Sequence, residues 1–322
     1  MRDGLISVII PVYNSENWIK KCVDSLLKQR YKNIEILLIN DWSSDNSLEE
    51  LKKLSQKSKD IKVISHENHW VWYTRNVWIK QSKWDYITFV DADDRLDVDF
   101  LETLYKEIWD NDMVISWYKQ VDINDNLIFK RRLKPRYESR FRQMVIRWKL
   151  YKREFLVKND IYFNELKIWE DISFSWCCYV NTEKIKVINY VWYNNLRHIE
   201  SVTHNISLGK QNTTLEIFRK IGELSSDTFL IKNLKYVNFF FLKEFANWMI
   251  GKAWLMSRED LLQLWSKNWF RLKNFFQIKG LKLFFRYNTT EPFKINVATY
   301  FIYLFMKFRL HWVLTFLLKI IK

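Results

Sequence analysis

Three aspartates stand close together in the segment VDADD, at positions 91, 93 and 94. Carboxylates gathered in this way repel one another unless a hard cation or hydrogen-bond donors lie between them. A D-x-D pair suits Mg²⁺ or Mn²⁺, because one or two carboxylates leave the remaining octahedral positions to water and a diphosphate. The segment therefore predicts a Mn²⁺ or Mg²⁺ site. The alternative is a solvated acidic turn before the helix that follows Leu96.

Other polar residues also follow apolar, strand-like runs. PVYN (11–14) ends the run LISVII, NDWSSDNS (40–47) ends IEILLI, and VDADD (90–94) ends DYITF. Ligands of open α/β sheets bind at the carboxyl ends of the strands, so we expect Asp41 to share one edge of the sheet with the three aspartates.

The order of the predicted elements indicates how these residues are positioned. Apolar, β-branched runs predict strands at 5–13, 34–40, 61–65, 85–91, 113–118 and 184–193. Helical periodicity predicts helices at 19–27, 46–57, 73–82, 97–109 and 149–163. This alternation is typical of an α/β fold with a doubly wound sheet and helices on both faces.

Composition divides the 322 residues into two regions. Residues 201–322 carry 19 Lys and Arg against 7 Asp and Glu, a net charge of +12. This region therefore holds most of the net charge of +15 of the whole chain. We expect an α/β domain at 1–210 and a basic, amphipathic helical region at 211–322. Neither region holds a run of eighteen uncharged apolar residues, so a membrane-spanning helix is not expected.

Cysteine usage and the N-terminus bear on the compartment. The three cysteines, Cys22, Cys177 and Cys178, do not have the spacing of metal ligands. Separately, the hydrophobic content of 48% excludes a disordered chain. The N-terminus runs directly into a strand and carries no small-residue cleavage site. We therefore expect a cytoplasmic protein. The basic C-terminal region predicts peripheral attachment to an anionic membrane at its inner face.

Five blocks in order carry a family resemblance: VIIPVYN, INDxSSDNS, NxxVxYTRNxxI, DYITFVDADD and WEDISF. The series resembles family 2 glycosyltransferases, which are inverting enzymes with a GT-A fold, and it covers roughly residues 5–205. The resemblance implies a GT-A fold with a Rossmann-like, mixed sheet. It also implies a nucleotide-sugar donor, a UDP-sugar in our interpretation, and an acceptor hydroxyl.

The resemblance assigns roles to matching residues, which are listed here with their numbers in this chain. Pro11, Tyr13 and Asp41 would hold the nucleoside, Asp91 would approach the ribose, Ala92 belongs to the same donor block, Asp93 would bind the metal, and Arg75 would line the donor pocket. Asp171, with Glu170 beside it, would be the catalytic base that takes the proton of the acceptor hydroxyl. Arg197 or His198 would meet the diphosphate. The alternatives are surface residues for Arg75, Arg197 and His198, and dipole-complementing helix charges for Glu170 and Asp171.

Tryptophan stands where the family blocks have glycine. The chain has 17 tryptophans and 5 glycines, and no glycine occurs between positions 5 and 208. Glycine is expected at Trp42, Trp70, Trp78, Trp84 and Trp169, and further at Trp72, Trp117 and Trp148. Random drift would scatter changes over many residue types, whereas a gene that reads UGA as glycine, translated with UGA as tryptophan, gives this one recurring change.

The sequence thus predicts a metal-dependent, inverting glycosyltransferase of cell-surface polysaccharide or glycolipid synthesis, for which a lipid-linked sugar is one candidate acceptor. A nucleotidyltransferase would need a Gly-rich phosphate loop after the first strand, and PVYNSEN is not one. The non-enzymatic alternative is a catalytically dead GT-A domain that binds a membrane surface or nucleic acid. A nucleic-acid partner is the less expected of the two.

Overall fold

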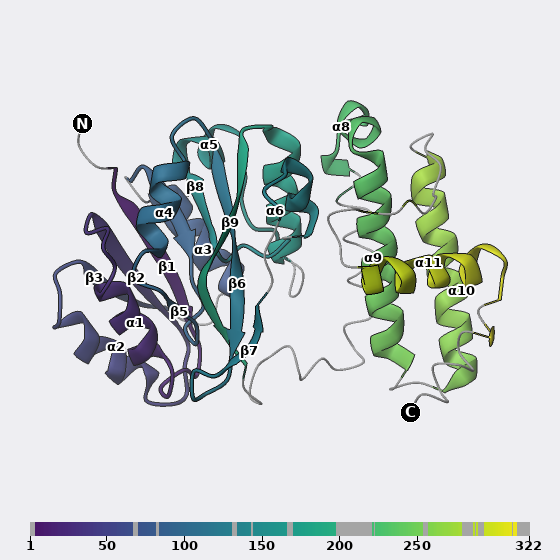
Figure 1. Cartoon of the computed structure of the whole chain (residues 1–322). Coiled ribbons are helices and arrows are strands. Elements are labelled where there is room, and N and C mark those ends of the chain that lie inside the picture. Colours follow the sequence, from purple (N-terminus) through teal and green to yellow (C-terminus); the bar gives the residue numbers. More distant parts are fainter. Residues whose placement is uncertain are drawn as a thin grey trace. The chain divides into compact units, whose positions relative to one another are not determined.

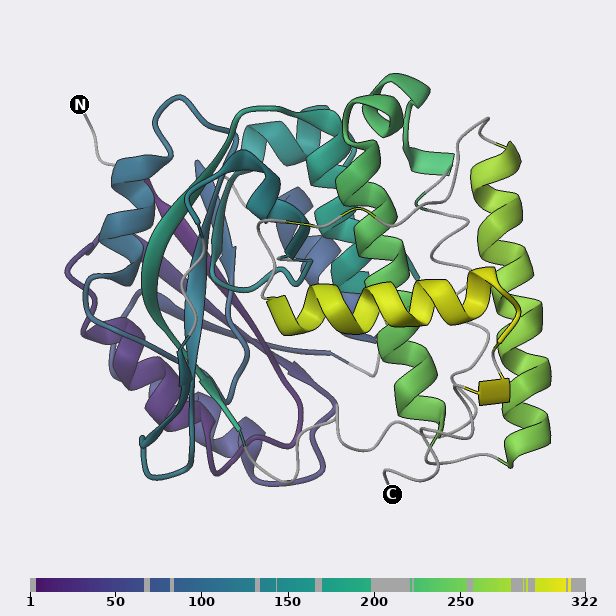
Figure 2. The same cartoon turned by 45° about the vertical axis from the view of Figure 1, so that its right-hand side comes forward.

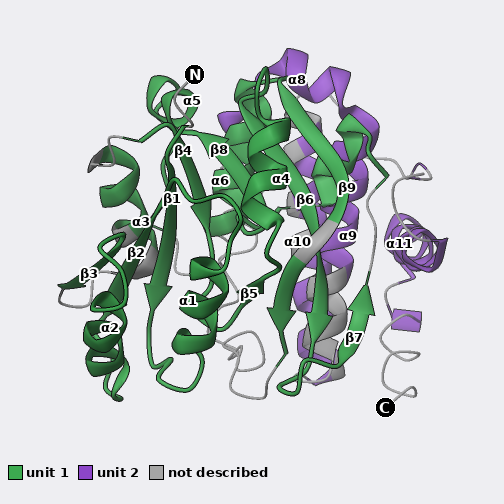
Figure 3. Cartoon of the chain, turned by 60° about the vertical axis from the view of Figure 1, so that its left-hand side comes forward, with its two compact units in different colours: residues 1–206 green, residues 207–322 purple. Residues whose placement is uncertain are grey.

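The computed structural model describes residues 4–313, except 67–69, 82–83, 131–133, 143, 166–169, 198–220, 222, 254–256, 279–285, 287, 289–292 and 311. The chain divides into two compact units, residues 1–206 and 207–322 (Figure 3). The expected boundary at residue 210 lies outside the described residues and stays a prediction.

A mixed nine-stranded sheet forms the centre of the first unit (Figure 1). The strands are β1 (Ile6–Val12), β2 (Ile34–Asp41), β3 (Ile61–His66), β4 (Tyr86–Phe89), β5 (Arg95–Leu96), β6 (Met113–Val121), β7 (Leu127–Lys130), β8 (Lys149–Lys152) and β9 (Ile185–Leu196). Their order is β3-β2-β1-β4-β8-β6-β9-β5, and β7 pairs with β6. Strands β1 to β4 are parallel, while β8 runs antiparallel to both of its neighbours. The predicted mixed, doubly wound sheet is confirmed.

Helices cover both faces of this sheet. They are α1 (Ile19–Leu27), α2 (Ser47–Ser55), α3 (Trp70–Gln81), α4 (Phe100–Glu107), a 3₁₀ helix (Tyr137–Arg142), α5 (Arg153–Lys158) and α6 (Glu170–Asn181). Alternate residues of β1, Ile6, Val8 and Ile10, share a core with α1, α2 and α4. Strands β1 and β2 are buried almost throughout, which explains their continuous apolar runs.

The predicted helix at 149–163 is wrong in its first turn. Residues Lys149–Lys152 form β8, and only Arg153–Lys158 are helical. The backbone of β8 fills the gap between β4 and β6. In the sequence, Lys149 resembles a charged residue on the exposed side of a helix. In the structure its side chain is fully buried.

The second unit is helical. It contains α8 (Asp227–Lys232), α9 (Leu234–Ala253), α10 (Arg258–Ile278) and α11 (Phe293–Lys307), and α11 crosses α9 (Figure 2). In the part of the chain that the structure describes, none of the helices combines the length and the apolar character needed to cross a bilayer.

Candidate functional site

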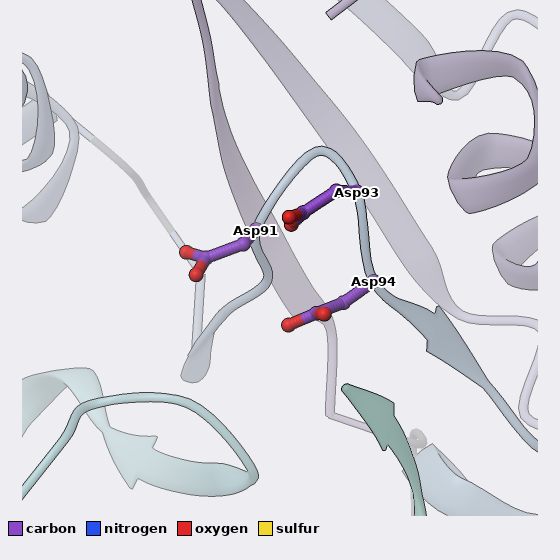
Figure 4. A group of neighbouring side chains, drawn as sticks. All are labelled: Asp91, Asp93 and Asp94. Atoms are coloured by element: carbon purple, nitrogen blue, oxygen red, sulfur yellow. The ribbon is translucent and has the colours of Figure 1, made fainter. Parts of the chain in front are cut away.

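The three aspartates of VDADD lie in the turn after β4, and their side chains extend to the same side of it (Figure 4). A ligand oxygen from each of Asp91, Asp93 and Asp94 lies within 4.8 Å of the other two. Three carboxylates so close together have the hard oxygen donors that Mg²⁺ and Mn²⁺ prefer. The residues therefore fit the expected metal.

The three carboxylates have different surroundings. Asp94 is fully buried, and its Oδ1 accepts hydrogen bonds from the Leu196 N–H at 2.9 Å and from Asn195 Nδ2 at 3.1 Å. Burial raises the pKa of Asp94 to about 8, although Arg147 opposes this shift. Asp94 thus holds the turn after β4 against the end of β9. Asp91 and Asp93 are only half-buried at the rim.

Arg147 is a cation of this rim that the sequence analysis missed. Its Nη1 lies 2.7 Å from Asp91 Oδ2 and 3.3 Å from Asp94 Oδ2. Strand β8 pairs antiparallel with β4, Ile87 opposite Tyr151, so continuing that register places Arg147 opposite Asp91. The pairing of β8 with β4 indicates this position of Arg147. The sequence pattern predicts a helix at 149–163 instead of a strand, so the pairing could not be inferred from it. Tyr193 was also missed, and its hydroxyl accepts a hydrogen bond from the Asp91 N–H.

A second charged group joins α3 to the start of α6. Arg75 is 5% exposed, and its Nη1 lies 3.1 Å from Asp171 Oδ1 and 3.3 Å from Glu170 Oε1. Its Nη2 lies 3.9 Å from Asp91 Oδ1, and its guanidinium lies 5.1 Å from the centre of the Phe163 ring. Arg75 is therefore not a solvated surface residue. It links the two carboxylates of α6 to Asp91 after β4.

Burial changes the acidity of the α6 carboxylates. It raises the pKa of Glu170 to about 7, with a further rise from the neighbouring Asp171 and an opposing effect of Arg75. Burial also raises the pKa of Asp171, again against Arg75. A carboxylate whose pKa is raised toward neutrality is a stronger proton acceptor, which suits a general base.

The predicted nucleoside residues lie at the ends of the neighbouring strands. Pro11 is in β1, Tyr13 follows β1 and is 56% exposed, and Asp41 ends β2 and is 6% exposed. The two loops are held together, because the Asn14 N–H donates to Ser43 Oγ at 3.1 Å.

The remaining predicted residues are placed less closely. Ala92 is buried in the turn after β4. Arg197 follows β9, and its side chain is exposed, while its N–H donates to the Val121 carbonyl at 2.9 Å. His198 lies outside the described residues. The structure thus brings together Asp91, Asp93, Glu170, Asp171 and Arg75, and it places Arg197 only in the backbone next to Leu196.

The sequence of this chain is similar to those of known glycosyltransferases. Residues 7–165 match the model of Glycosyl transferase family 2. The N-terminal unit belongs to this family. Among curated relatives, glycosyltransferase GlyA of Streptococcus pneumoniae is 33% identical over an alignment of 214 residues, and the match covers 59% of this chain and 30% of GlyA. The uncharacterized glycosyltransferase EpsJ of Bacillus subtilis is 30% identical over 221 residues, 62% of this chain and 64% of EpsJ. The chain thus matches less than two thirds of the length of either relative.

Solved structures agree with the family. The fragment 1–349 of S. aureus TarS, crystallised in complex with UDP, has a TM-score of 0.67 and 25% identity, and the match covers 85% of this chain and 80% of the fragment. The same fragment with UDP-GlcNAc gives a TM-score of 0.67 at 24% identity, covering 85% and 81%. The GT-A fold expected from the sequence is confirmed.

Three of the tryptophans at expected glycine positions lie in left-handed backbone or at a strand irregularity, where glycine is favoured. Trp42 and Trp148 adopt left-handed backbone, with φ of 57° and 51°. Trp117 lies where the register between β6 and β9 shifts, and its Nε1 is buried without a hydrogen-bond partner. Glycine is favoured at such conformations and irregularities because it has no Cβ.

The other positions differ. Trp70, Trp72 and Trp78 lie within α3, where helical backbone needs no positive φ. Trp84 is half-buried, and Trp169 lies outside the described residues. Translation of UGA as tryptophan stays a prediction.

Proposed function

We propose that this protein is an inverting glycosyltransferase that moves a sugar from a UDP-sugar to an acceptor hydroxyl, in the synthesis of a cell-surface polysaccharide or glycolipid. The observation that carries the proposal is the ion-pair group around Arg75, which holds Glu170 and Asp171 beside the aspartates after β4. In this proposal the candidate base lies next to the candidate diphosphate and metal site, and the ion pairs of Arg75 support this position. The UDP in the TarS crystal structure supports uridine as the nucleoside.

In the proposed reaction, an Asp171 oxygen takes the proton of the acceptor hydroxyl as the hydroxyl oxygen attacks the anomeric carbon. The bond between that carbon and the diphosphate oxygen breaks, and its electron pair leaves with UDP. Arg75 orients Asp171 and keeps part of its charge balanced in a buried setting. Attack from the face opposite to the leaving group inverts the configuration.

Binding of the donor is assigned to the strand ends. Asp41 would face the uracil, with Pro11 and Tyr13 beside it, and Asp91 would approach the ribose. Asp93 would hold Mn²⁺ or Mg²⁺, because Asp94 is committed to Leu196 and Asn195 in β9. When bound, the metal ion stabilises the charge that develops on the departing diphosphate.

Calorimetry and turnover test these two assignments separately. UDP should bind much more tightly with Mn²⁺ than without it, and Asp93→Asn should remove this difference. Asp171→Asn should leave UDP binding near normal and lower turnover by roughly 10²-fold or more, as loss of a general base implies. The matched control is Asp110→Asn, at an exposed position after α4. Binding of UDP that ignores Mn²⁺ would remove the metal from the proposal, and normal turnover of Asp171→Asn would move the base to Glu170.

We also propose that the basic C-terminal unit attaches the protein to the inner face of the cell membrane. Support comes from the sequence, since residues 261–322 carry eleven Lys and Arg and one acidic residue, Glu291. Anionic lipid attracts such a segment. Attachment would place the site near a lipid-linked acceptor.

A further inference from the structure

Helix α11 has a buried face and an exposed face. One face is buried within the C-terminal unit and consists of Asn296, Thr299, Ile302, Tyr303 and Met306. On this face the Tyr303 ring lies 6.4 Å from the ring of Trp269 in α10. The buried face therefore accounts for the packing of α11 inside its own unit.

The opposite face exposes large rings. Phe293 is 70% exposed, Tyr300 41%, Phe301 51% and Phe308, directly after the helix, 62%. Intervals of seven, eight and fifteen residues place these rings along one side of a helix. Arg309 has left-handed backbone, with φ of 58°, so the helical spacing does not extend to Trp312, which is 53% exposed. We call Phe293, Tyr300, Phe301 and Phe308 the outer face. Contiguous exposed rings of this kind mark an interaction surface rather than ordinary solvent-facing positions.

The charges beside the outer face are all positive. Lys294, Lys307 and Arg309 are exposed, and residues 293–313 contain no Asp or Glu. Lys307 Nζ lies 5.7 Å from the centre of the Phe308 ring and 5.6 Å from that of Tyr303, so this charge lies at the border between the outer and the buried face. A second copy of this chain would set like charges against one another, which disfavours self-association through this face. Aromatic rings bordered by Lys and Arg instead match the boundary between acyl chains and anionic headgroups.

We propose that the outer face of α11 is the surface that docks on anionic phospholipid. The helix lies in the plane of the interface, with the rings of Phe301 and Phe308 among the acyl chains and the three basic residues at the phosphates. The proposal deepens the proposed membrane location. It does not depend on the transfer reaction, because lipid binding needs neither donor nor metal.

Vesicle sedimentation of the full chain tests the proposal. Vesicles of phosphatidylcholine alone are compared with vesicles that also contain phosphatidylglycerol. Three basic residues near the surface predict a preference of about 10²-fold for the anionic vesicles. The double variant Phe301→Glu/Phe308→Glu should lower anionic-vesicle binding by roughly tenfold or more, because both rings leave the acyl region and two negative charges enter it.

Two further variants distinguish the outer face from a general effect of charge or hydrophobicity. Ile231→Glu is the matched control, since Ile231 is 64% exposed on α8 of the same unit, and it should bind vesicles more than the double variant does. Replacing Lys294, Lys307 and Arg309 with Gln should remove the preference for anionic lipid. Circular dichroism checks that each variant is folded, and the Gln variant keeps the test decisive if the Glu variant is not.

Equal sedimentation of the wild type and the folded Glu variant would overturn the proposal, as would absence of wild-type binding to anionic vesicles. A change in mass by light scattering in the Glu variant, without lipid binding by the wild type, would instead make the face a contact between copies. Calorimetry with UDP and Mn²⁺ on the same preparations separates the outcomes. Lipid docking without UDP binding would contradict only the proposed transfer function.

Discussion

Trp42 and Trp148 share left-handed backbone and differ in packing, so replacing each with glycine should give opposite results. Trp42 is 57% exposed, and its ring lies mostly in solvent. Trp148 is 3% exposed, and its ring stacks on Tyr118 at 4.3 Å between centres and meets Tyr193 at 5.4 Å. The same substitution thus relieves the same backbone strain in two settings.

The magnitudes decide the signs. Left-handed backbone destabilises the folded state by about 1–2 kcal/mol for a bulky residue. Glycine relieves this strain, but it loses more chain entropy on folding, which offsets about 0.5–1 kcal/mol of the gain. Trp42→Gly should therefore raise the free energy of unfolding by about 0.5–1 kcal/mol. Loss of a buried aromatic side chain costs about 3–5 kcal/mol, so Trp148→Gly should lower the free energy of unfolding by about 2–4 kcal/mol.

Urea unfolding followed by circular dichroism measures both changes. Trp42→Ala is the matched control, because alanine also loses the ring but keeps a Cβ, and it should gain less stability than glycine. A loss of stability in Trp42→Gly, or equal results for alanine and glycine, would refute the argument from backbone strain. A gain in Trp148→Gly would show that the packing of this ring does not outweigh the strain, and would strengthen the case for glycine there.

Three other predictions concern acidity, charge and the gene. Burial raises the pKa of Glu170 to about 7 from an ordinary 4.5, so the folded state holds this proton more tightly and the free energy of unfolding falls as the pH rises through that interval. In Glu170→Gln, the free energy of unfolding measured with urea should fall less between pH 4.5 and 7. The same dependence on pH in this variant and in the wild type would contradict the prediction. Arg147→Met removes a cation between Asp91 and Asp94, so calorimetry without nucleotide should show Mn²⁺ binding roughly tenfold tighter or more, with Arg147→Lys near the wild type. Weaker Mn²⁺ binding by the Met variant would refute that. The gene should carry UGA at the five tryptophans that occupy the clearest family glycine positions, and UGG there would reject recoding.

The sequence predicted the first half of the sheet well, for physical reasons. Strands β1 and β2 are buried on both faces, so most of their positions are apolar and the runs can be recognised without knowing the partner strand. The buried polar pair Ser7 and Glu35 is joined by a hydrogen bond. Because parallel strands end at one edge, the position of Asp41 and of the aspartates after β4 followed from the strand order. These inferences needed only local pattern and topology.

What escaped prediction depends on residues far away in the sequence. Lys149 looks like an exposed charge, but its Nζ donates to Ser175 Oγ at 2.9 Å and to Tyr179 OH at 3.0 Å, and burial lowers its pKa to about 7. These partners come from α6, so the segment 149–152 alone does not reveal a buried strand. With β8 missed, the position of Arg147 beside Asp91 could not be inferred either.

The bond between Asp94 and the Leu196 N–H spans 102 residues, and the ion pair of Arg75 with Asp171 spans 96. Contacts of such long sequence separation can form only after both partners have been synthesised, and closing so long a loop costs chain entropy. During synthesis, the turn after β4 leaves the ribosome about a hundred residues before the strand that anchors it. The nascent chain can therefore pair β1 with β4 before β9 has been synthesised, whereas Asp94 gains its bonds to Asn195 and Leu196 only when β9 docks. A stalled chain that ends before residue 195 would hold Asp94 without these two anchors.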